Sequence, residues 1–180
     1  MAGRLVALLR GINVGRAKRV PMADLRALVG KLGYGDVKTL LNSGNVVFTS
    51  TDDAPRAAER IEEAIVERFG FSSRVTVLTA AELAAAVDGN PLVDIADDPS
   101  RLLVAVLADA ADRSRLEPLT EEDWAPESLA LGERVAYLWC PDGVLASRLP
   151  EAVGGALGEA VTTRNWRTVI KLFGLVDTPG

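Results

Sequence analysis

The segment RGINVGRAKR, which starts at position 10, combines residue types that bind anions. Its two glycines permit backbone turns that expose main-chain N–H groups, and such concave turns hold phosphate or carboxylate. Its cations add positive charge, and its asparagine adds a polar contact. We expect ligand contacts from Arg10, Gly11, Asn13, Gly15, Lys18 and Arg19. The Walker and dinucleotide-binding glycine patterns are both missing, and a mobile surface loop turned by its glycines is the alternative.

A second candidate site is Thr163-Arg164-Asn165, which precedes a stretch with helical periodicity. A helix N-terminus offers unpaired N–H groups and the positive end of the helix dipole, so it favours anions. Arg164 can bind a carboxylate with two parallel hydrogen bonds. The alternative is an ordinary helix start, with Asn165 as the cap and Arg164 paired to an acidic neighbour.

A third candidate is Asn42-Ser43-Gly44-Asn45. Ser43 beside two asparagines has the groups of a nucleophile with oxyanion donors, and we include Asn42 and Ser43 among the ligand-binding candidates. However, the pattern Gly-x-Ser-x-Gly is missing and no base is evident. A tight turn between two strands explains all four residues, and we favour it.

The absence of histidine excludes several kinds of chemistry. Serine–histidine and cysteine–histidine nucleophiles are excluded, as are histidine-ligated metal sites. The acidic runs Asp97-Asp98 and Glu121-Glu122-Asp123 lack calcium-loop spacing, so we interpret them as solvated surface and predict no metal site. Cys140 ends an apolar stretch and is interpreted as inert core. The sequence identifies no cofactor and no catalytic residue, so whether the protein is an enzyme stays open.

Charge is distributed unevenly along a chain of net charge -5. Residues 1–50 hold eight Lys and Arg against two Asp and Glu, whereas residues 51–159 hold nine against 22. Such asymmetry indicates either an anionic partner for the basic end or internal pairing between the basic ends and the acidic middle.

The first 80 residues predict a βαββαβ order. The strands are expected at 4–9, 37–41, 46–49 and 74–78, and the helices after Pro21 and Pro55. Gly33 and Gly70 are expected to end the two helices. This order is typical of a ferredoxin-like fold, in which an antiparallel sheet carries two helices on one face.

The remaining chain predicts a similar second half. Thr79 and Glu82 form a capping box before a short helix, and a polar linker extends to residue 100. Strands are expected at 101–107, 129–131 and 135–140, a helical or looped segment at 109–123, a weak helix at 144–158 and a final helix ending at Gly174. We therefore predict an α+β protein of two ferredoxin-like halves in tandem, at 1–78 and 101–180, joined by residues 79–100.

Two motifs resemble a known family. The stretch from position 7 to 48, ALLRGINVGRAKRVPMADLRALVGKLGYGDVKTLLNSGNVVF, resembles the opening of the domain-of-unknown-function 1697 family, and TTRNWRTVIKL at 162–172 resembles its closing motif. The resemblance implies a bacterial, cytosolic protein of two ferredoxin-like halves and implies no activity. This chain has Arg16 where the family commonly has a second glycine, which would hinder a very close backbone approach to a ligand.

Three functions remain open. The favoured one is binding of a phosphate- or carboxylate-bearing ligand at the loop from Arg10 to Arg19 and at Arg164. The second is an enzyme acting on a small phosphorylated or carboxylated metabolite between the two halves. The third is a regulatory module that binds a protein. Nucleic acid is a weaker candidate because aromatics are only 5% of the chain.

The expected location is the cytoplasm. The single cysteine fits a reducing compartment. The longest uncharged stretch, at 39–51, is too short and too polar to span a bilayer, so we predict no membrane partner. The N-terminus shows no signal-peptide pattern. The oligomeric state is not predicted.

Overall fold

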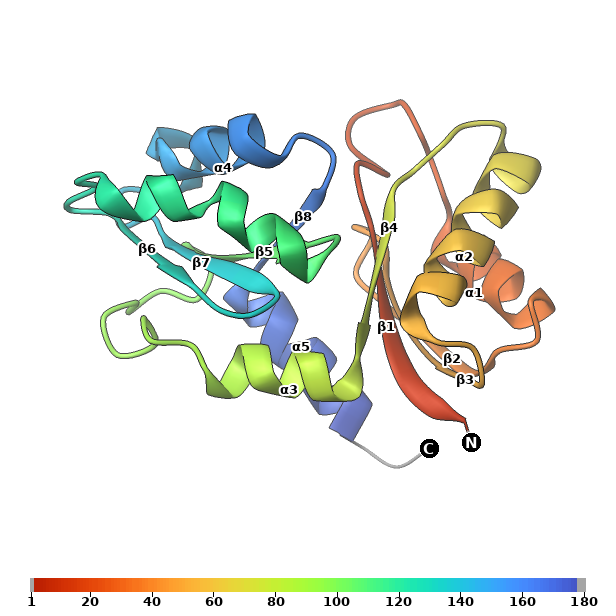
Figure 1. The fold of residues 1–180 in the computed structure, drawn as a ribbon. Coiled ribbons are helices and arrows are strands. Elements are labelled where there is room, and N and C mark those ends of the chain that lie inside the picture. The colour runs from red at the N-terminus through yellow and green to blue at the C-terminus, as the bar shows by residue number, and fades with distance from the viewer. Residues whose placement is uncertain (1, 178–180) are drawn as a thin grey trace. The chain divides into compact units, whose positions relative to one another are not determined.

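A computed structural model describes residues 2–177 (Figure 1). The described residues divide into two compact units: the first contains residues 2–83 and 172–177, and the second runs from Ala84 to Lys171. Each unit contains one four-stranded antiparallel sheet. The divisions fall within two helices, α3 (Ala80–Asp88) and α5 (Trp166–Asp177).

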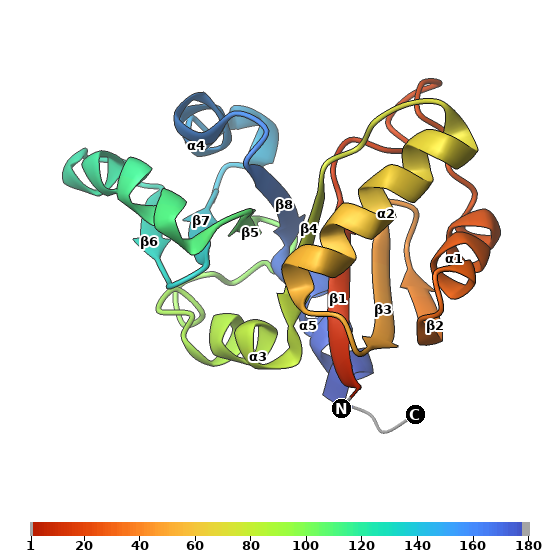
Figure 2. The same ribbon diagram turned by 45° about the vertical axis from the view of Figure 1, so that its right-hand side comes forward.

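The first unit has the predicted βαββαβ order. Its elements are β1 (Gly3–Leu9), α1 (Met22–Lys31), β2 (Gly35–Leu40), β3 (Asn45–Ser50), α2 (Ala54–Phe69) and β4 (Val75–Thr79). The strands lie in the order β2-β3-β1-β4, and all neighbours are antiparallel. Both helices cover the same face of this sheet (Figure 2). The ferredoxin-like prediction is confirmed for this unit.

Local signals in the sequence set the helix ends. The Asp53 carboxylate accepts a hydrogen bond from the Arg56 amide at 2.9 Å and so caps α2. Gly70 ends α2 with φ +77°, a left-handed conformation that favours glycine. At α3 the predicted capping box is complete: the Glu82 amide donates to Thr79 Oγ1, and the Thr79 amide donates to Glu82 Oε1.

The core of the first unit lies between the sheet and its two helices. Alternate β1 residues, Leu5, Ala7 and Leu9, point into it because successive strand residues face opposite sides of a sheet. Ile61 and Ile65 of α2 are fully buried against them. The sheet thus sets the positions of the strand ends from which the loops leave.

The second unit repeats the same sheet topology. Its elements are β5 (Leu102–Leu107), the 3-10 segments η1 (Ala110–Arg115) and η2 (Glu117–Glu121), β6 (Ser128–Leu131), β7 (Val135–Trp139), η3 (Val144–Ala146), α4 (Leu149–Leu157) and β8 (Val161–Asn165). The strand order is β6-β7-β5-β8. Numbered from the start of the unit, this is the order of the first sheet.

The second unit buries its own core on one face of its sheet. Leu116, Leu149 and Val153 pack there against β5 and β7. On the other face, the Tyr137 hydroxyl donates a hydrogen bond to the Ala86 carbonyl of α3 at 2.5 Å. The Tyr137 side chain is also buried, and this burial raises the pKa of its hydroxyl to about 12.

Near the C-terminus the structure differs from the prediction at a strand and at the last helix. Residues 161–165 form β8, a strand where the sequence predicts only the approach to a helix. Helix α5 does not end at Gly174 but continues to Asp177. Tertiary contacts outweigh local preference at β8, because this strand pairs along its length with β5. No helix within residues 2–177 is long and apolar enough to cross a membrane.

Candidate functional site

The β1–α1 loop, residues 10–21, has an unusual backbone. Gly11, Asn13 and Gly15 have φ values of +70°, +56° and +66°, while Ile12 and Val14 between them lie outside the left-handed region. Left-handed residues that alternate with residues of negative φ are the backbone pattern of an anion nest, so this stretch is a candidate for one. The glycines fit because left-handed φ costs them little, and asparagine is among the other residues that tolerate it.

Several amides in this loop are available to a ligand. The N–H groups of Val14, Gly15 and Arg16 donate to no acceptor among the described residues. The Asn13 amide is different, because it donates to the Lys18 carbonyl at 3.0 Å and closes the loop on itself. The open amides therefore lie at the tip of a loop whose base is bonded.

The Asn13 side chain holds the loop in place. Its Nδ2 donates to the Val20 carbonyl at 2.9 Å and to the Asn42 carbonyl at 2.7 Å, and its Oδ1 accepts from the Val20 amide at 2.8 Å. Both side-chain amide hydrogens are thus used inside the protein. These bonds hold the loop, while the ligand contact that the sequence suggests for Asn13 stays a prediction.

The β2–β3 turn, residues 41–44, lies against the base of the loop. Gly44 has φ +88°, and a Cβ at this position would lie 2.8 Å from Leu9 Cβ and from Ile12 Cδ1. The predicted tight turn is present here, and Ser43 Oγ accepts a hydrogen bond from Asn45 Nδ2 at 2.8 Å. Asn42 contributes its carbonyl to Asn13, so the predicted residues of both loops share one end of the sheet.

A third segment completes this end of the first sheet. The Arg10 amide donates to the Arg74 carbonyl at 2.9 Å, and Ser73 Oγ donates to the Arg10 carbonyl at 2.8 Å. Lys18 Nζ donates to the Ser72 carbonyl at 3.2 Å. The loop is consequently fixed to the start of β4 as well as to the β2–β3 turn.

Positive charge is concentrated in this loop. Arg16, Lys18 and Arg19 are exposed, and within residues 2–177 none of the three forms an ion pair. Arg19 donates to the Gly15 carbonyl at 3.2 Å. The first acidic residue of the chain is Asp24. An anion at the open amides would therefore meet uncompensated positive charge.

The second candidate site lies in the second unit. Arg164 is in β8, one residue before Asn165 ends that strand, and its guanidinium donates to the Thr163 carbonyl at 3.0 Å. Burial lowers the pKa of Arg164 to about 10, so the side chain is still cationic at neutral pH. Asn165 Oδ1 accepts from the Thr168 amide at 2.9 Å and caps α5.

Similarity to known proteins gives the family. The family model described as "Protein of unknown function (DUF1697)" matches residues 2–137. The chain belongs to the DUF1697 family. Among solved structures, that of the conserved bacterial protein SP0830 from Streptococcus pneumoniae is similar with a TM-score of 0.81 and 23% identity, covering 98% of this chain and 100% of that one. At this identity the likeness shows the fold alone. No curated protein matches the chain.

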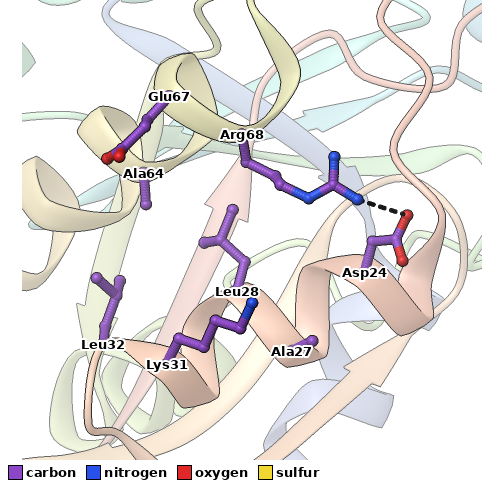
Figure 3. A pocket seen from close by; sticks show the side chains of 8 residues that line it. All are labelled: Asp24, Ala27, Leu28, Lys31, Leu32, Ala64, Glu67 and Arg68. Atoms are coloured by element: carbon purple, nitrogen blue, oxygen red, sulfur yellow. Dashed lines mark ion pairs between the residues drawn. The ribbon is translucent and has the colours of Figure 1, made fainter.

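Membership of the DUF1697 family carries no activity, so other possible sites need to be weighed against the loop. A cavity of about 520 Å³ lies between α1 and α2 (Figure 3). Its floor is apolar, with Leu28 and Leu32, and its charges are mixed: Asp24 pairs with Arg68 at 3.7 Å. It concentrates neither sign of charge. No group of three metal-ligating side chains occurs among the described residues.

Sequence reasoning leaves three residues of this region out of the site. Arg16 stands out in the sequence only as a departure from the family pattern, although its amide and its charge both lie at the tip. Val14 and Leu41 are aliphatic side chains with exposed fractions of 73% and 53%. An aliphatic residue beside glycine or asparagine carries no signal in a single sequence that it will be exposed.

Proposed function

We propose that this DUF1697 protein binds a phosphate or carboxylate group at the tip of the β1–α1 loop. The observation that carries the proposal is the alternating backbone at Gly11, Asn13 and Gly15 beside amides that have no acceptor among the described residues. Main-chain N–H groups arranged in this way bind anions without any particular side chain. Such a site does not depend on histidine or a metal, which suits this composition.

The surrounding charges support the same ligand class. Arg16, Lys18 and Arg19 add three cations around the amides and no acid. Because these side chains are exposed, each contributes little alone, but together they raise the local concentration of anions. The proposal includes Arg10, which leads into the loop, and the side chains of Asn42 and Ser43 at its base.

Preorganisation supports the site energetically. Asn13 fixes the loop through three hydrogen bonds, and Lys18 and Arg10 are bonded to the residues before β4. A ligand that binds a loop already in its binding conformation does not have to order it, and this saves free energy. Asn13 acts in this proposal by positioning the amides.

Arg164 and Asn165 enter the proposal as a separate anion contact in the second unit. The support is a cation at the end of β8 directly before a capped helix. Arginine and a helix start both favour a carboxylate or phosphate. We also propose a cytoplasmic location, because the single cysteine, Cys140, is a buried free thiol.

The test is titration of the whole protein with inorganic phosphate and pyrophosphate, followed by amide NMR. We expect the largest shifts at Val14, Gly15 and Arg16, and an affinity that falls about tenfold when Arg16, Lys18 and Arg19 are all changed to Gln. Arg56→Gln on α2 is the matched control, because Arg56 is also exposed but pairs with Glu59.

A second variant separates shape from charge. Asn13→Gly tolerates the positive φ and removes the three side-chain hydrogen bonds, so it should weaken anion binding while the net charge stays the same. The proposed function is wrong if neither anion shifts the amide resonances of Val14, Gly15 and Arg16. It is also wrong if the triple Gln variant binds the anions as tightly as the unchanged protein.

A further inference from the structure

We infer that the ligand carries an aliphatic group next to its anionic group, so that the site recognises an alkyl phosphate or alkyl carboxylate more tightly than a bare anion. This inference rests on the proposed function and narrows it. It is carried by two exposed side chains: Val14, whose own amide is one of the open ones, and Leu41, in the turn that is hydrogen-bonded to the loop.

These two residues are exposed in a way that the other aliphatic residues of the loop are not. Val14 has an exposed fraction of 73% and Leu41 of 53%, while Ile12 and Val20 of the β1–α1 loop are at 2% and 1%. Ile12 and Val20 thus supply the apolar anchoring that the loop needs for folding. The exposed pair adds little to that core, and its apolar surface is available to a bound molecule.

The structure holds the two aliphatic residues on two segments that are bonded to each other. Val14 follows Asn13 in sequence and Leu41 precedes Asn42, and Asn13 Nδ2 donates to the Asn42 carbonyl at 2.7 Å. The turn also packs closely on the loop, since a Cβ at Gly44 would lie 2.8 Å from Ile12 Cδ1. The loop and the turn are therefore bonded and packed together, and each contributes one exposed aliphatic side chain.

The backbone at Leu41 indicates that its exposure is maintained at a cost. Leu41 has φ +58°, a conformation that is unfavourable for a side chain of this kind. Asparagine or glycine would fit this turn position better. A leucine that is both strained and exposed is consistent with a role in contacting something outside the folded chain.

The chemistry of the surface selects the occupant. The nest and the cations Arg16, Lys18 and Arg19 fit an anionic head, and the two aliphatic side chains fit an apolar tail. Residues 10–21 and 41–44 contain no aromatic residue, so a flat nucleobase would find no ring in these segments on which to stack. A short aliphatic chain matches both halves of the surface.

The experiment compares inorganic phosphate with methyl, butyl and hexyl phosphate, using calorimetry and amide NMR on the whole protein. Each methylene that is fully buried increases affinity by up to about fourfold. We expect butyl phosphate to bind at least about tenfold more tightly than methyl phosphate. The methyl resonances of Val14 and Leu41 should shift with the alkyl phosphates and not with inorganic phosphate.

Two variants test the residues. Val14→Ser and Leu41→Asn remove the aliphatic surface, and asparagine suits the φ of position 41. We expect both to abolish the chain-length effect. Leu41→Asn, which leaves the loop amides untouched, should also keep the affinity for inorganic phosphate of the unchanged protein. Val66→Ser is the matched control, because Val66 is also exposed, at 49%, but lies on α2.

The outcomes separate this inference from the proposed function. Equal affinity along the alkyl series, with phosphate still bound at the loop amides, overturns the inference and leaves the anion site standing. Tighter binding of phenyl or nucleoside phosphates than of butyl phosphate also overturns it. If no member of the series binds, the proposed function and the inference both fall.

Discussion

In both sheets the last residue of the first strand donates an equivalent main-chain hydrogen bond. The residues around that strand end differ between the two sheets. In the first unit the Leu9 amide donates to the Gly44 carbonyl, and in the second the Leu107 amide donates to the Arg134 carbonyl, both at 2.9 Å. Gly44 and Arg134 therefore occupy equivalent positions. One is a glycine in contact with a long loop, and the other is an arginine.

The arginine covers the strand end that the loop covers in the first unit. Arg134 Nε donates to the Leu107 carbonyl at 2.7 Å, and one terminal nitrogen donates to the Ala108 carbonyl at 2.9 Å. Only Ala108 and Asp109 separate β5 from η1, whereas residues 10–21 separate β1 from α1. The shared topology therefore forms without a long loop at this position.

The largest expected effect is at Gly44. Gly44→Ala should lower the free energy of unfolding by about 2–4 kcal/mol, because the new Cβ would meet Leu9 and Ile12 at 2.8 Å and would also adopt a left-handed φ. Urea unfolding measures the loss. Gly70→Ala is the control, since Gly70 has φ +77° but no atom within 4 Å of the place that a Cβ would occupy; it should lose only about 1 kcal/mol. Equal losses at both sites would mean that contact with the loop is not what requires glycine.

The equivalent change in the second unit is expected to be smaller. Arg134→Met should lower the free energy of unfolding by about 2 kcal/mol, because it leaves the Leu107 and Ala108 carbonyls without their side-chain donor. Hydrogen exchange at the end of β5 should speed up with it. Arg115→Met, which removes an exposed pair with Asp112, should change stability by less than about 0.5 kcal/mol. If the two variants are equally stable, the hydrogen bonds of Arg134 do not stabilise the end of β5.

The sequence alone predicts most of the scaffold. Helix α2 is bounded by an aspartate cap and a glycine stop that act locally, and the Thr79–Glu82 capping box is found as expected. Strand β8 escapes prediction because its five residues, VTTRN, lie next to a helix cap and form a strand only through pairing with β5. Short segments whose structure depends on distant partners give no local signal.

The candidate site could be predicted from the sequence in its residue types but not in its geometry. The glycines and cations of the β1–α1 loop indicate anion binding from their residue types alone. The commitment of the Asn13 side chain to Val20 and Asn42 depends on a turn 29 positions away. The exposure of Leu41 likewise depends on how its turn is held. Sequence patterns identify groups that can bind, while tertiary contacts decide which of them hold the loop.

The smallest expected effect concerns the end of the first sheet opposite the β1–α1 loop, where polar side chains hydrogen-bond to one another. Tyr34 donates to Asp52 Oδ2 at 2.8 Å, and Arg60 donates to the same oxygen at 2.7 Å and to the Leu32 carbonyl. The hydrogen bond from Arg60, followed by that from Tyr34, holds the pKa of Asp52 below its ordinary value of 3.8. The polar side chains at this end are therefore hydrogen-bonded within the protein. At the other end, the amides of Val14, Gly15 and Arg16 donate to no acceptor among the described residues.

The hydrogen bonds that Asp52 accepts from Tyr34 and Arg60 should make the stability of the protein depend on pH. Because the pKa of Asp52 is lowered by folding, its contribution is complete above the unfolded value near 3.8 and is lost as the pH falls through the lowered pKa. We expect Asp52→Asn to be less stable than the unchanged protein at pH 7 and the difference to shrink in acid, measured by urea midpoints from neutral pH down to about pH 2.5. Glu63→Gln, an exposed change on α2 that breaks none of these hydrogen bonds, is the control. A stability difference between Asp52→Asn and the unchanged protein that stays constant with pH would mean that the charge of Asp52 does not stabilise this end of the sheet. The contrast between the two ends of the sheet would then rest on the β1–α1 loop alone.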